Sequence, residues 1–362
     1  MSRVAAAKPT ISTVAERARV APTTVSRVLN GGYVSADVRS RVQKVIRDLG
    51  YVPSSTARSL KYGRKGCIGV VVESVHGPWF MGLLAGIEEE LAKKRISVML
   101  GGLKPGGKYD SSTVASWLDE RRIDGLIFAR YTKRERSLFE AARDAEIPIS
   151  FICPDESVGR GFTVRCRNVE AGRTVATHLL ELGHRRIAFS GGPKNSIDST
   201  DRLRGLEEQL ALANAPALRA EDTAFGSAYD PEAGIRAAQD FLRRPVAQRP
   251  TAVVLGNDTM ALAFMRELLR SGLRIPEDVS VVGFDGVEEG ARFWPSLTTV
   301  AQPMHTLGST ACRVLLERIE EPEHDIVTTV EHPMELVARE STGPAPARVT
   351  KTAPPSNRRK GR

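Results

Sequence analysis

The sequence predicts an α/β protein that carries a small all-α module at its N-terminus. The first 60 residues contain amphipathic helical stretches and no convincing strand, whereas from Cys67 onward short apolar runs alternate with such stretches. Buried apolar strands joined by helices are typical of parallel sheets. A chain of 362 residues is also too long for one ordinary domain, so we expect two or three domains.

The N-terminal segment predicts three short helices. Apolar residues at helical spacing indicate a first helix over Ser12–Ala18, which Arg19-Val20-Ala21 interrupts. Pro22 suits the first position of a second helix, because the N–H that it lacks has no partner there in any case. The Gly31-Gly32 pair stops that helix, and a third is expected at about Ala36–Leu49. Three short helices with a tight turn between the first two indicate a helix-turn-helix module.

The apolar runs of the larger segment predict buried strands with helices between several of them. The strands are expected at Ile68–Val72, Ile96–Leu100, Gly125–Ala129, Ile147–Ile152, Ile187–Ser190, Ala252–Leu255 and Val279–Phe284. Helices are expected at Met81–Lys94, Ala171–Leu182 and Met260–Ser271. Residues 67–342 are too many for one sheet, so we expect two lobes with parallel sheets. Their strand ends should face a shared cleft, where open α/β sheets bind ligands.

Charge is unevenly distributed along the chain. Residues 1–66 hold 13 Lys and Arg against three acids, and residues 343–362 hold six Lys and Arg and no acid, whereas residues 67–342 carry a net charge of −7. A basic head on a mildly acidic body indicates that the head contacts a polyanion. The tail, rich in Pro and small polar residues, is expected to be disordered and to serve solubility.

Composition argues against the membrane, secreted and disulfide-rich classes. No stretch approaches the ~18 consecutive apolar residues that a membrane helix needs, and Met1–Thr10 lacks the apolar region of a secretory signal. Cys67, Cys153, Cys166 and Cys312 lie far apart and form no C-x-x-C pair, so neither a zinc site nor a disulfide framework is expected. Buried free thiols fit a reducing cytoplasm, where we expect the protein to work.

The sequence shows no catalytic constellation. No G-x-G-x-x-G follows the first strand, since the Gly101-Gly102 and Gly106-Gly107 pairs miss that spacing, and no G-x-S-x-G, G-K-[ST] or H-E-x-x-H motif occurs. The six histidines do not group along the chain. We therefore expect neither an enzyme nor a bound cofactor or metal.

A series of short motifs runs through residues 10–341. They are Thr24-Val25-Ser26-Arg27-Val28-Leu29-Asn30, Val34-Ser35, Leu49-Gly50-Tyr51-Val52-Pro53, Ala57-Arg58-Ser59-Leu60, Ile68-Gly69-Val70, Leu182-Gly183-His184-Arg185-Arg186-Ile187, Gly256-Asn257-Asp258, Val279-Ser280-Val281-Val282-Gly283-Phe284-Asp285 and Leu297-Thr298-Thr299-Val300. In order and spacing, this series resembles the LacI/GalR family of bacterial repressors. The resemblance implies a helix-turn-helix headpiece that a hinge helix joins to a two-lobe core similar to periplasmic binding proteins.

The resemblance also implies that the second helix lies in the major groove of DNA, with its N-terminal side chains on base edges. Pro22 and Thr23 would then face the bases, Pro22 by apolar contact alone. Arg27 would reach a neighbouring phosphate or a guanine, whose O6 and N7 match the fork of a guanidinium. Ser12, Thr24, Ser26 and Asn30 would hold phosphates, which fix register, and Tyr33 is placed with the DNA-contacting residues.

Two positions depart from the family pattern. Arg19 stands where the family has Gly in the turn, and Ala21 stands where it has a Ser or Thr that caps the second helix. A non-Gly residue at positive φ costs ~1–2 kcal/mol, and an absent cap hydroxyl costs ~1 kcal/mol. The module should therefore form but be looser away from DNA.

Residues 54–61 match the family's hinge segment. By resemblance this segment becomes a short helix on operator DNA and pairs with the same helix of a second copy. Ser54 would contact DNA, Ala57 would let the two helices approach closely, and Leu60 would insert into the minor groove. An apolar wedge of this kind kinks the duplex at a base step.

The cleft should bind a small molecule, because several positions match ligand-contacting ones in the family. They are Trp79, Phe80, Ser196, Asp198, Arg202, Tyr229, Asn257 and Asp285. Trp79 and Phe80 could stack on a ring, while Arg202 and Asp285 could form paired hydrogen bonds to vicinal hydroxyls. Family members that bind purines tend to carry Arg where this chain has Ser196. A sugar or sugar derivative is therefore the expected effector, and a purine or another metabolite is the alternative.

These expectations assign the chain to domains. They are a disordered N-terminus at 1–9, a DNA-binding domain at 10–53, a hinge at 54–66, an effector-binding and dimerisation domain at 67–342 and a disordered basic tail at 343–362. The N-lobe is expected at about 67–165 and 299–326, and the C-lobe at about 166–298 and 327–342.

The predicted partners are a palindromic operator, an effector and a second copy of the chain. A symmetric operator requires a two-fold dimer, and the absence of leucine heptads after Ser341 argues against a coiled-coil tetramer. Effector binding would shift operator affinity by linkage. A solute-binding protein without DNA function is the remaining alternative, and the basic head argues against it.

Overall fold

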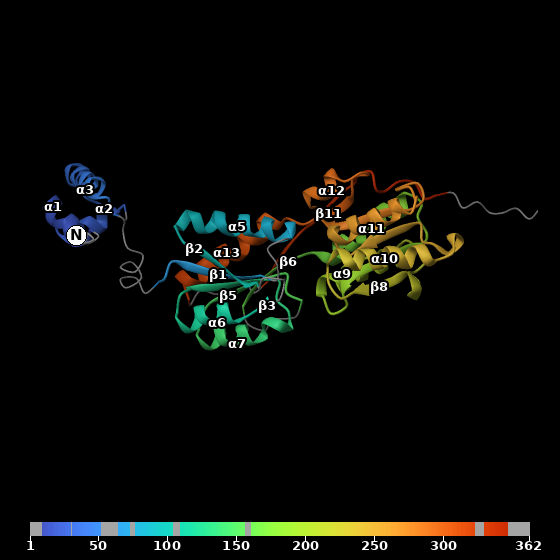
Figure 1. The fold of residues 1–362 in the computed structure, drawn as a ribbon, viewed down its shortest axis with the longest axis horizontal. Coiled ribbons are helices and arrows are strands. Elements are labelled where there is room, and N and C mark those ends of the chain that lie inside the picture. Colours follow the sequence, from blue (N-terminus) through green and yellow to red (C-terminus); the bar gives the residue numbers. More distant parts are fainter. Residues whose placement is uncertain are drawn as a thin grey trace, which may run out of the picture. The chain divides into compact units, whose positions relative to one another are not determined.

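The computed structural model describes residues 9–29, 31–51, 64–72, 77–103, 109–155, 161–322 and 329–346. The chain divides into two compact units, Met1–Gly66 and Cys67–Arg362 (Figure 1). Among the described residues, no helix is both long and apolar enough to cross a membrane. The predicted hinge falls largely in residues 52–63, which lie outside the described residues, as do residues 1–8 and 347–362.

The described residues of the first unit form three helices, as predicted. They are α1 (Ile11–Ala18), α2 (Pro22–Leu29) and α3 (Ala36–Leu49). Their inward faces bury a small apolar cluster that includes Val14, Val25 and Val42. Thr10 caps α1, since its hydroxyl accepts from the N–H of Thr13. Arg19 ends α1 in the left-handed conformation at φ 51°, the position where the family has Gly.

The N-lobe of the second unit is built on a seven-stranded sheet. Its order is β12 (Thr329–His332), β6 (Phe162–Cys166), β5 (Ile149–Ile152), β4 (Gly125–Ala129), β1 (Cys67–Val72), β2 (Ser97–Leu103) and β3 (Tyr109–Asp110). Only β3 runs antiparallel to its neighbour. The helices of this lobe are α5 (Pro78–Lys94), α6 (Ser112–Asp119), η1 (Lys133–Glu135), α7 (Arg136–Asp144) and α13 (Met304–Glu320).

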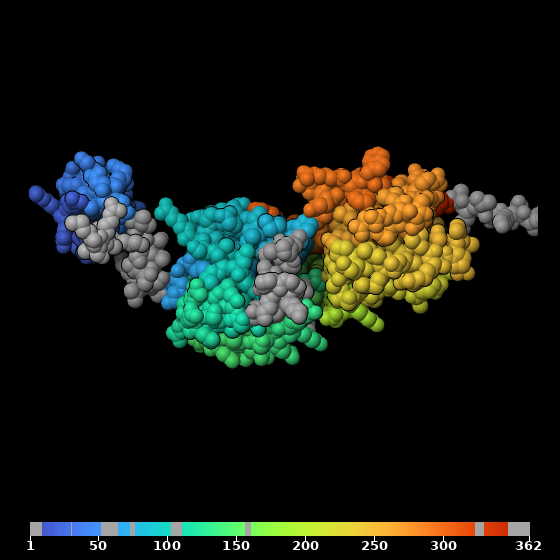
Figure 2. Space-filling model, viewed as in Figure 1, coloured from blue at the N-terminus to red at the C-terminus, as the bar shows by residue number. Residues whose placement is uncertain are grey.

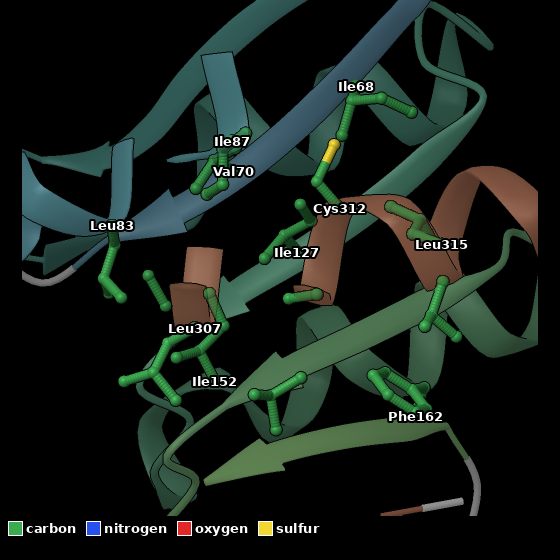
Figure 3. Packing of buried hydrophobic residues seen from close by; sticks show 14 of the residues in the cluster. Ile68, Val70, Leu83, Ile87, Ile127, Ile152, Phe162, Leu307, Cys312 and Leu315 are labelled. Carbon is green, nitrogen blue, oxygen red and sulfur yellow. The ribbon is translucent and has the colours of Figure 1, made fainter. Parts of the chain in front are cut away.

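A dense apolar core joins this sheet to α5 and α13. Figure 3 shows Leu83 and Ile87 of α5, Val70 of β1 and Leu307 of α13 within one cluster. The two helices touch backbone to backbone, because a Cβ on Gly86 would lie 2.0 Å from the carbonyl oxygen of His305. Although α13 comes late in the sequence, it packs among elements from the first half of the core (Figure 1).

The C-lobe is built on a six-stranded sheet. Its order is β13 (Glu335–Val337), β11 (Thr298–Ala301), β10 (Ser280–Asp285), β9 (Ala252–Leu255), β7 (Ile187–Pro193) and β8 (Thr223–Gly226), and only β13 is antiparallel. Its helices are α8 (Asn168–Glu181), α9 (Ile197–Leu212), η2 (Ala220–Asp222), α10 (Pro231–Arg243), η3 (Val246–Gln248), α11 (Asp258–Arg270) and α12 (Glu288–Arg292). The predicted α/β architecture of two parallel-dominated sheets is thus confirmed, and Figure 2 shows the N-lobe mainly in blue, cyan and green and the C-lobe mainly in yellow to orange.

Among its described elements, the chain crosses between the lobes three times. The crossings follow β6, β11 and β12, so residues 299–301 belong to the C-lobe and residues 329–332 to the N-lobe. The sequence placed both segments in the opposite lobe. The reason is strand pairing: β11 adds in parallel to β10, and β12 adds in parallel to the β6 edge.

The first residues of the expected tail are part of the C-lobe. The carbonyl oxygen of Gly343 accepts a hydrogen bond from Nε2 of His184 at 3.1 Å, and the N–H of Ala345 donates to the carbonyl of Leu182 at 2.8 Å. Residues 343–346 therefore do not belong to a disordered tail. They complete the hydrogen bonding of a buried histidine, which a sequence pattern does not reveal.

Candidate functional site

The outer face of α2 presents the side chains that the sequence assigned to DNA. Val25 and Val28 face the module's core, whereas Pro22, Thr23 and Arg27 are exposed. This division follows from helical periodicity, since residues three and four apart share a face. The exposed side of α2 therefore offers the apolar ring of Pro22, the hydroxyl of Thr23 and the guanidinium of Arg27.

The flanking positions are also accessible. Ser12 is exposed on α1, Thr24 and Ser26 are half-buried, and Tyr33 is 93% exposed. The loop that carries Tyr33 is fixed to α3, because Nη2 of Arg39 donates to the carbonyl of Gly32 at 2.8 Å. The expected contacts Asn30, Ser54, Ala57 and Leu60 lie outside the described residues.

The second unit contains a polar cavity at the carboxyl ends of its parallel strands. Its volume is about 160 Å³, far above the roughly 10–15 Å³ that one water needs, so it has room for a small molecule. Its lining consists of Val72, Gly77, Pro78, Trp79, Phe80, Ala129, Arg130, Asp198, Arg202, Tyr229, Asn257, Thr259, Asp285 and Gln302. Every expected effector residue except Ser196 is among them.

Arg202 is the most firmly positioned cation of the cavity. It is buried, its Nε donates to Oδ1 of Asn168 at 2.7 Å, and its Nη1 donates to the carbonyl of Gly256 at 2.6 Å. Its guanidinium also lies 4.4 Å from the centre of the Phe284 ring. Asn168 in turn donates to Asp198 at 2.8 Å, so one amide orients both charged groups. Such a prearranged set loses little entropy when a ligand binds.

The position of Arg202 depends on close packing of α8 against α9. A Cβ on Gly172 would lie 2.2 Å from the carbonyl oxygen of Arg202. We expect Gly172→Ala to push the helices apart, to lower the free energy of unfolding of the core by about 1–3 kcal/mol and to weaken effector binding. Denaturant unfolding measures the first effect and an effector titration the second. Thr174→Ala, on the exposed face of α8, is the control; equal stability of the two variants would contradict this account.

Asp285 enters the cavity from a strained backbone. It ends β10 at φ 126°, and Gly286 follows at φ 79°. Asp258 holds this turn, because its carboxylate accepts from the N–H groups of Gly286 and Val287 at 2.8 and 2.9 Å and from the hydroxyl of Thr299 at 2.6 Å. Nε2 of Gln302 donates to Asp285 at 2.6 Å. A residue held in this region of φ is a mark of functional sites.

Burial raises the pKa values of the Asp285 and Asp258 carboxyl groups. Desolvation, followed by the nearby charge of Asp258, raises the pKa of Asp285 to about 8. Desolvation also raises the pKa of Asp258 to about 6, against the hydrogen bonds from Thr299, Val287 and Gly286. Asp285 is thus largely protonated at neutral pH in the unliganded protein and can donate a hydrogen bond as well as accept one.

This shift predicts a pH dependence of stability. A carboxyl group with a raised pKa binds more protons in the folded state, so its stabilising effect is lost as pH rises from the unfolded pKa to the folded one. Between pH 6.5 and 8, the free energy of unfolding of the core should fall by about 1–2 kcal/mol through Asp285. Urea unfolding at several pH values measures this, and Asp285→Asn should remove most of the fall. An equal fall in that variant would assign it to other groups.

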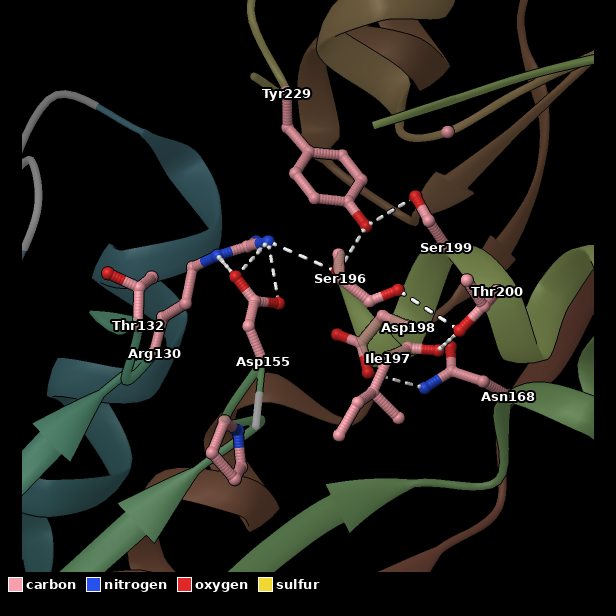
Figure 4. A network of polar contacts seen from close by, with 12 residues as sticks. Arg130, Thr132, Asp155, Asn168, Ser196, Ile197, Asp198, Ser199, Thr200 and Tyr229 are labelled. Carbon is pink, nitrogen blue, oxygen red and sulfur yellow. Dashed lines mark hydrogen bonds and ion pairs between the residues drawn. The ribbon is translucent and has the colours of Figure 1, made fainter. Parts of the chain in front are cut away.

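Arg130 is a cleft residue that sequence reasoning missed. It follows β4 at φ 69°, and its Nη2 donates to both carboxylate oxygens of Asp155 at 3.1 Å (Figure 4). The guanidinium reaches from the N-lobe to the C-lobe, where it lies 4.4 Å from the centre of the Tyr229 ring and 3.4 Å from Oγ of Ser196. Arg130 therefore joins the two lobes across the cleft.

Ser196 lies behind this contact and does not line the cavity. It is fully buried, and its hydroxyl shares a hydrogen bond of 3.0 Å with the phenol of Tyr229, which also bonds to Ser199 at 2.9 Å (Figure 4). Ser196 thus helps to hold the Tyr229 side chain in place. Thr259 and Gln302 are further lining residues that the sequence did not suggest. Their places in the chain could have indicated them, because Gln302 directly follows strand β11 and Thr259 directly follows the Gly256-Asn257-Asp258 motif.

The four cysteines are free thiols. Cys153, Cys166 and Cys312 are buried free thiols and Cys67 is half-buried. Burial raises the pKa of the Cys312 thiol to about 12, which makes it a poor nucleophile. Within the described part of the chain, no group of three or more His, Cys, Asp or Glu could hold a metal ion.

Two family models match the chain. The model for bacterial regulatory proteins of the lacI family matches residues 10–54, and the model for a periplasmic binding protein-like domain matches residues 176–342. The first covers the three-helix module, and the second covers most of the C-lobe.

Curated relatives extend over nearly the whole chain. The HTH-type transcriptional repressor PurR of Aliivibrio fischeri strain MJ11 is 33% identical over 317 residues, which are 87% of this chain and 93% of that protein. PurR of Erwinia tasmaniensis is 34% identical over 345 residues, which are 94% of this chain and 98% of that protein.

Solved structures show the same architecture. A Lac repressor dimer bound to operator and the anti-inducer ONPF has a TM-score of 0.76 at 26% identity, covering 93% of this chain and all of that one. The complex of the regulator CelR with cellobiose has a TM-score of 0.67 at 29% identity, covering 92% and 99% of the two chains. A LacI family regulator from Enterococcus faecium with bound ribose has a TM-score of 0.66 at 28% identity, covering 77% and 99%.

Proposed function

Because the chain belongs to the lacI family of bacterial regulatory proteins, we propose that it is a transcriptional repressor whose affinity for an operator is controlled by a small molecule in the cleft. The observation that carries this proposal is the pairing of an exposed helix-turn-helix surface with a polar cavity between two lobes. An enzyme with the same core would have no use for the basic headpiece.

On the DNA side, α2 enters the major groove. Arg27 reads a guanine or holds an adjacent phosphate, and Thr23 and Pro22 face base edges. Ser12, Thr24, Ser26, Asn30 and Tyr33 fix the register on the backbone, and Ser54, Ala57 and Leu60 act in the hinge. The exposure of Pro22, Thr23 and Arg27 together on one face of α2 supports these roles.

On the effector side, the cleft suits a compact polyhydroxylated ligand. Its two guanidiniums, Arg130 and Arg202, are matched by carboxylates, so there is no excess positive charge that would select an anion. Carboxyl, amide and phenol groups supply donors and acceptors for hydroxyls, and Trp79 supplies a flat apolar surface. The ribose and cellobiose complexes of related regulators agree with a sugar.

A purine is the second candidate, because the PurR repressors are among the relatives of this chain. Arg130, which lies over Tyr229, could donate to a purine ring from the opposite lobe. The residue at position 196 argues against a purine, since purine-binding members tend to carry Arg there. This chain has a serine, which is buried and bonded to Tyr229.

The regulator acts as a homodimer. A two-fold symmetric operator requires two headpieces related by the same symmetry, and the Lac repressor structure that resembles this chain is a dimer on its operator. Such a protein works in the cytoplasm, where the chromosome lies.

Selection of bound duplexes from a randomised DNA pool at fixed near-physiological salt tests the proposal. We expect a two-fold symmetric site with half-sites about one helical turn apart. Titration with ribose, cellobiose and adenine, a purine base, should then change the affinity for that site with at least one of them, a sugar by preference. Recovery of only non-specific, steeply salt-dependent binding, with and without these metabolites, would refute it.

A further inference from the structure

One side chain in the crossover between the lobes contacts three separate parts of the core. Gln302 directly follows β11, and its N–H donates to the carbonyl of Asp285 at 3.0 Å. Its Nε2 donates to the Asp285 carboxyl group at 2.6 Å. Its Oε1 accepts from Nε1 of Trp79 at 3.2 Å and from the thiol of Cys166 at 3.5 Å.

The chemistry of the partners fixes the orientation of this amide. An indole N–H can only donate, so the oxygen of Gln302 must face Trp79. The nitrogen then faces the Asp285 carboxyl group, whose Oδ1 accepts from it at 2.6 Å. An apolar side chain of similar length would satisfy neither partner.

The three partners come from both lobes of the core. Trp79 is at the start of α5 in the N-lobe, Asp285 ends β10 in the C-lobe, and Cys166 ends β6 at the first crossover. Trp79 and Asp285 also line the effector cavity, as Gln302 does. Gln302 is thus the point where the cavity, both lobes and two of the three crossovers meet.

We propose that Gln302 is a positioning residue that couples occupancy of the cavity to the arrangement of the lobes. A ligand that engages Asp285 changes the Asp285–Gln302 hydrogen bond, and the amide passes that change to Trp79 of the N-lobe. The inference rests on the proposed function, because the readout of lobe arrangement is operator affinity. It adds to that function a specific residue through which the signal passes.

The first test needs no effector. Full-length wild type, Gln302→Met, Gln302→Glu and the exposed control Gln248→Ala are compared for affinity to the selected operator without ligand. Met keeps the length of the side chain and removes all its polar bonds. We expect it to change the operator Kd by about fivefold or more, the lower end of typical coupling between sites. Glu keeps the acceptor for Trp79 but has no N–H for Asp285, so the hydrogen bond to Asp285 must reverse or break, and the Kd should change in the same direction.

A spectroscopic readout separates coupling from a general loss of structure. The chain has three tryptophans, so 5-fluorotryptophan labelling gives three ¹⁹F resonances, and Trp79→Phe assigns one of them. In Gln302→Met only the Trp79 resonance should move, whereas in Gln302→Glu it should stay near its wild-type position. Movement of all three resonances would indicate altered folding. The operator Kd of Gln302→Glu would then be the measurement that tests the coupling.

A double-mutant cycle tests whether Gln302 acts through Trp79. If Gln302 acts through Trp79, the effects of Trp79→Phe and Gln302→Met on operator Kd are not additive. Additive effects, or a Gln302→Met protein whose Kd stays within twofold of wild type, would overturn the inference. Absence of operator binding by wild type would instead overturn the proposed function, so the two failures are distinguishable.

Discussion

Arg202→Ala is expected to abolish the response to effector. The substitution removes a buried guanidinium that is bonded to Asn168 and Gly256 and leaves the buried Asp198 carboxylate without its neighbouring cation. Truncating a buried, hydrogen-bonded charged group at a binding site costs about 2–5 kcal/mol of affinity, so effector affinity should fall by about 30-fold or more. Isothermal titration with the metabolite that emerges from the screen measures this.

Two further variants control this result. Arg204→Ala changes an exposed arginine on the same helix and should leave effector affinity unchanged. Arg202→Lys keeps the charge but not the fork, so it should resemble Arg202→Ala more than wild type. The headpiece does not contain Arg202, so binding to operator without effector should persist in all three. Near-normal effector affinity in Arg202→Lys would mean that only charge matters at this position.

Arg27→Ala is expected to have the largest effect on DNA. Arg27 is exposed on the face of α2 that begins with Pro22, and a two-pronged contact to guanine contributes about 1–3 kcal/mol of discrimination. Affinity for the selected operator should fall by about 5- to 150-fold for each half-site that is read. In a symmetric dimer that reads both half-sites, the loss of binding free energy is doubled. Competition binding at fixed salt against the selected and a scrambled duplex measures it.

The comparison with a scrambled duplex distinguishes base reading from phosphate contact. Loss of a base contact relaxes specificity at one operator position, whereas loss of a phosphate contact weakens both duplexes equally. Arg41→Ala is a suitable control, because Arg41 is exposed on α3 and paired with Asp37 at 3.3 Å. If Arg27→Ala weakens both duplexes to the same extent, Arg27 holds a phosphate and does not read a base.

The cleft geometry explains how these two functions can be linked. Arg130 and Gln302 both bridge the lobes, Arg130 through Tyr229 and Ser196 and Gln302 through Trp79 and Asp285. A ligand that competes for either contact has a different affinity for different lobe arrangements. Such differential affinity is the condition for a ligand to shift a conformational equilibrium.

The sequence by itself determined the elements whose signals are local. The three helices of the headpiece followed from apolar spacing, Pro22 and the Gly31-Gly32 stop, because helix formation depends on neighbours within four residues. The central strands β1, β4, β9 and β10 were predicted nearly to the residue, because strands buried on both faces are continuous apolar runs. The family motifs located the seven expected residues that now line the cavity.

Only the tertiary structure decided what depends on partners distant in the sequence. The edge strands β8, β12 and β13 are half-exposed and have no apolar run, so their pairing identifies them. That pairing set the lobe boundaries and drew residues 343–346 into the C-lobe. Arg130 and Gln302 became site residues because β4 and β11 end at the cleft, and the turn at Asp285 became strained because Asp258 holds it. Long-range pairing and buried polar contacts have no local periodicity, so no pattern in the sequence could reveal them.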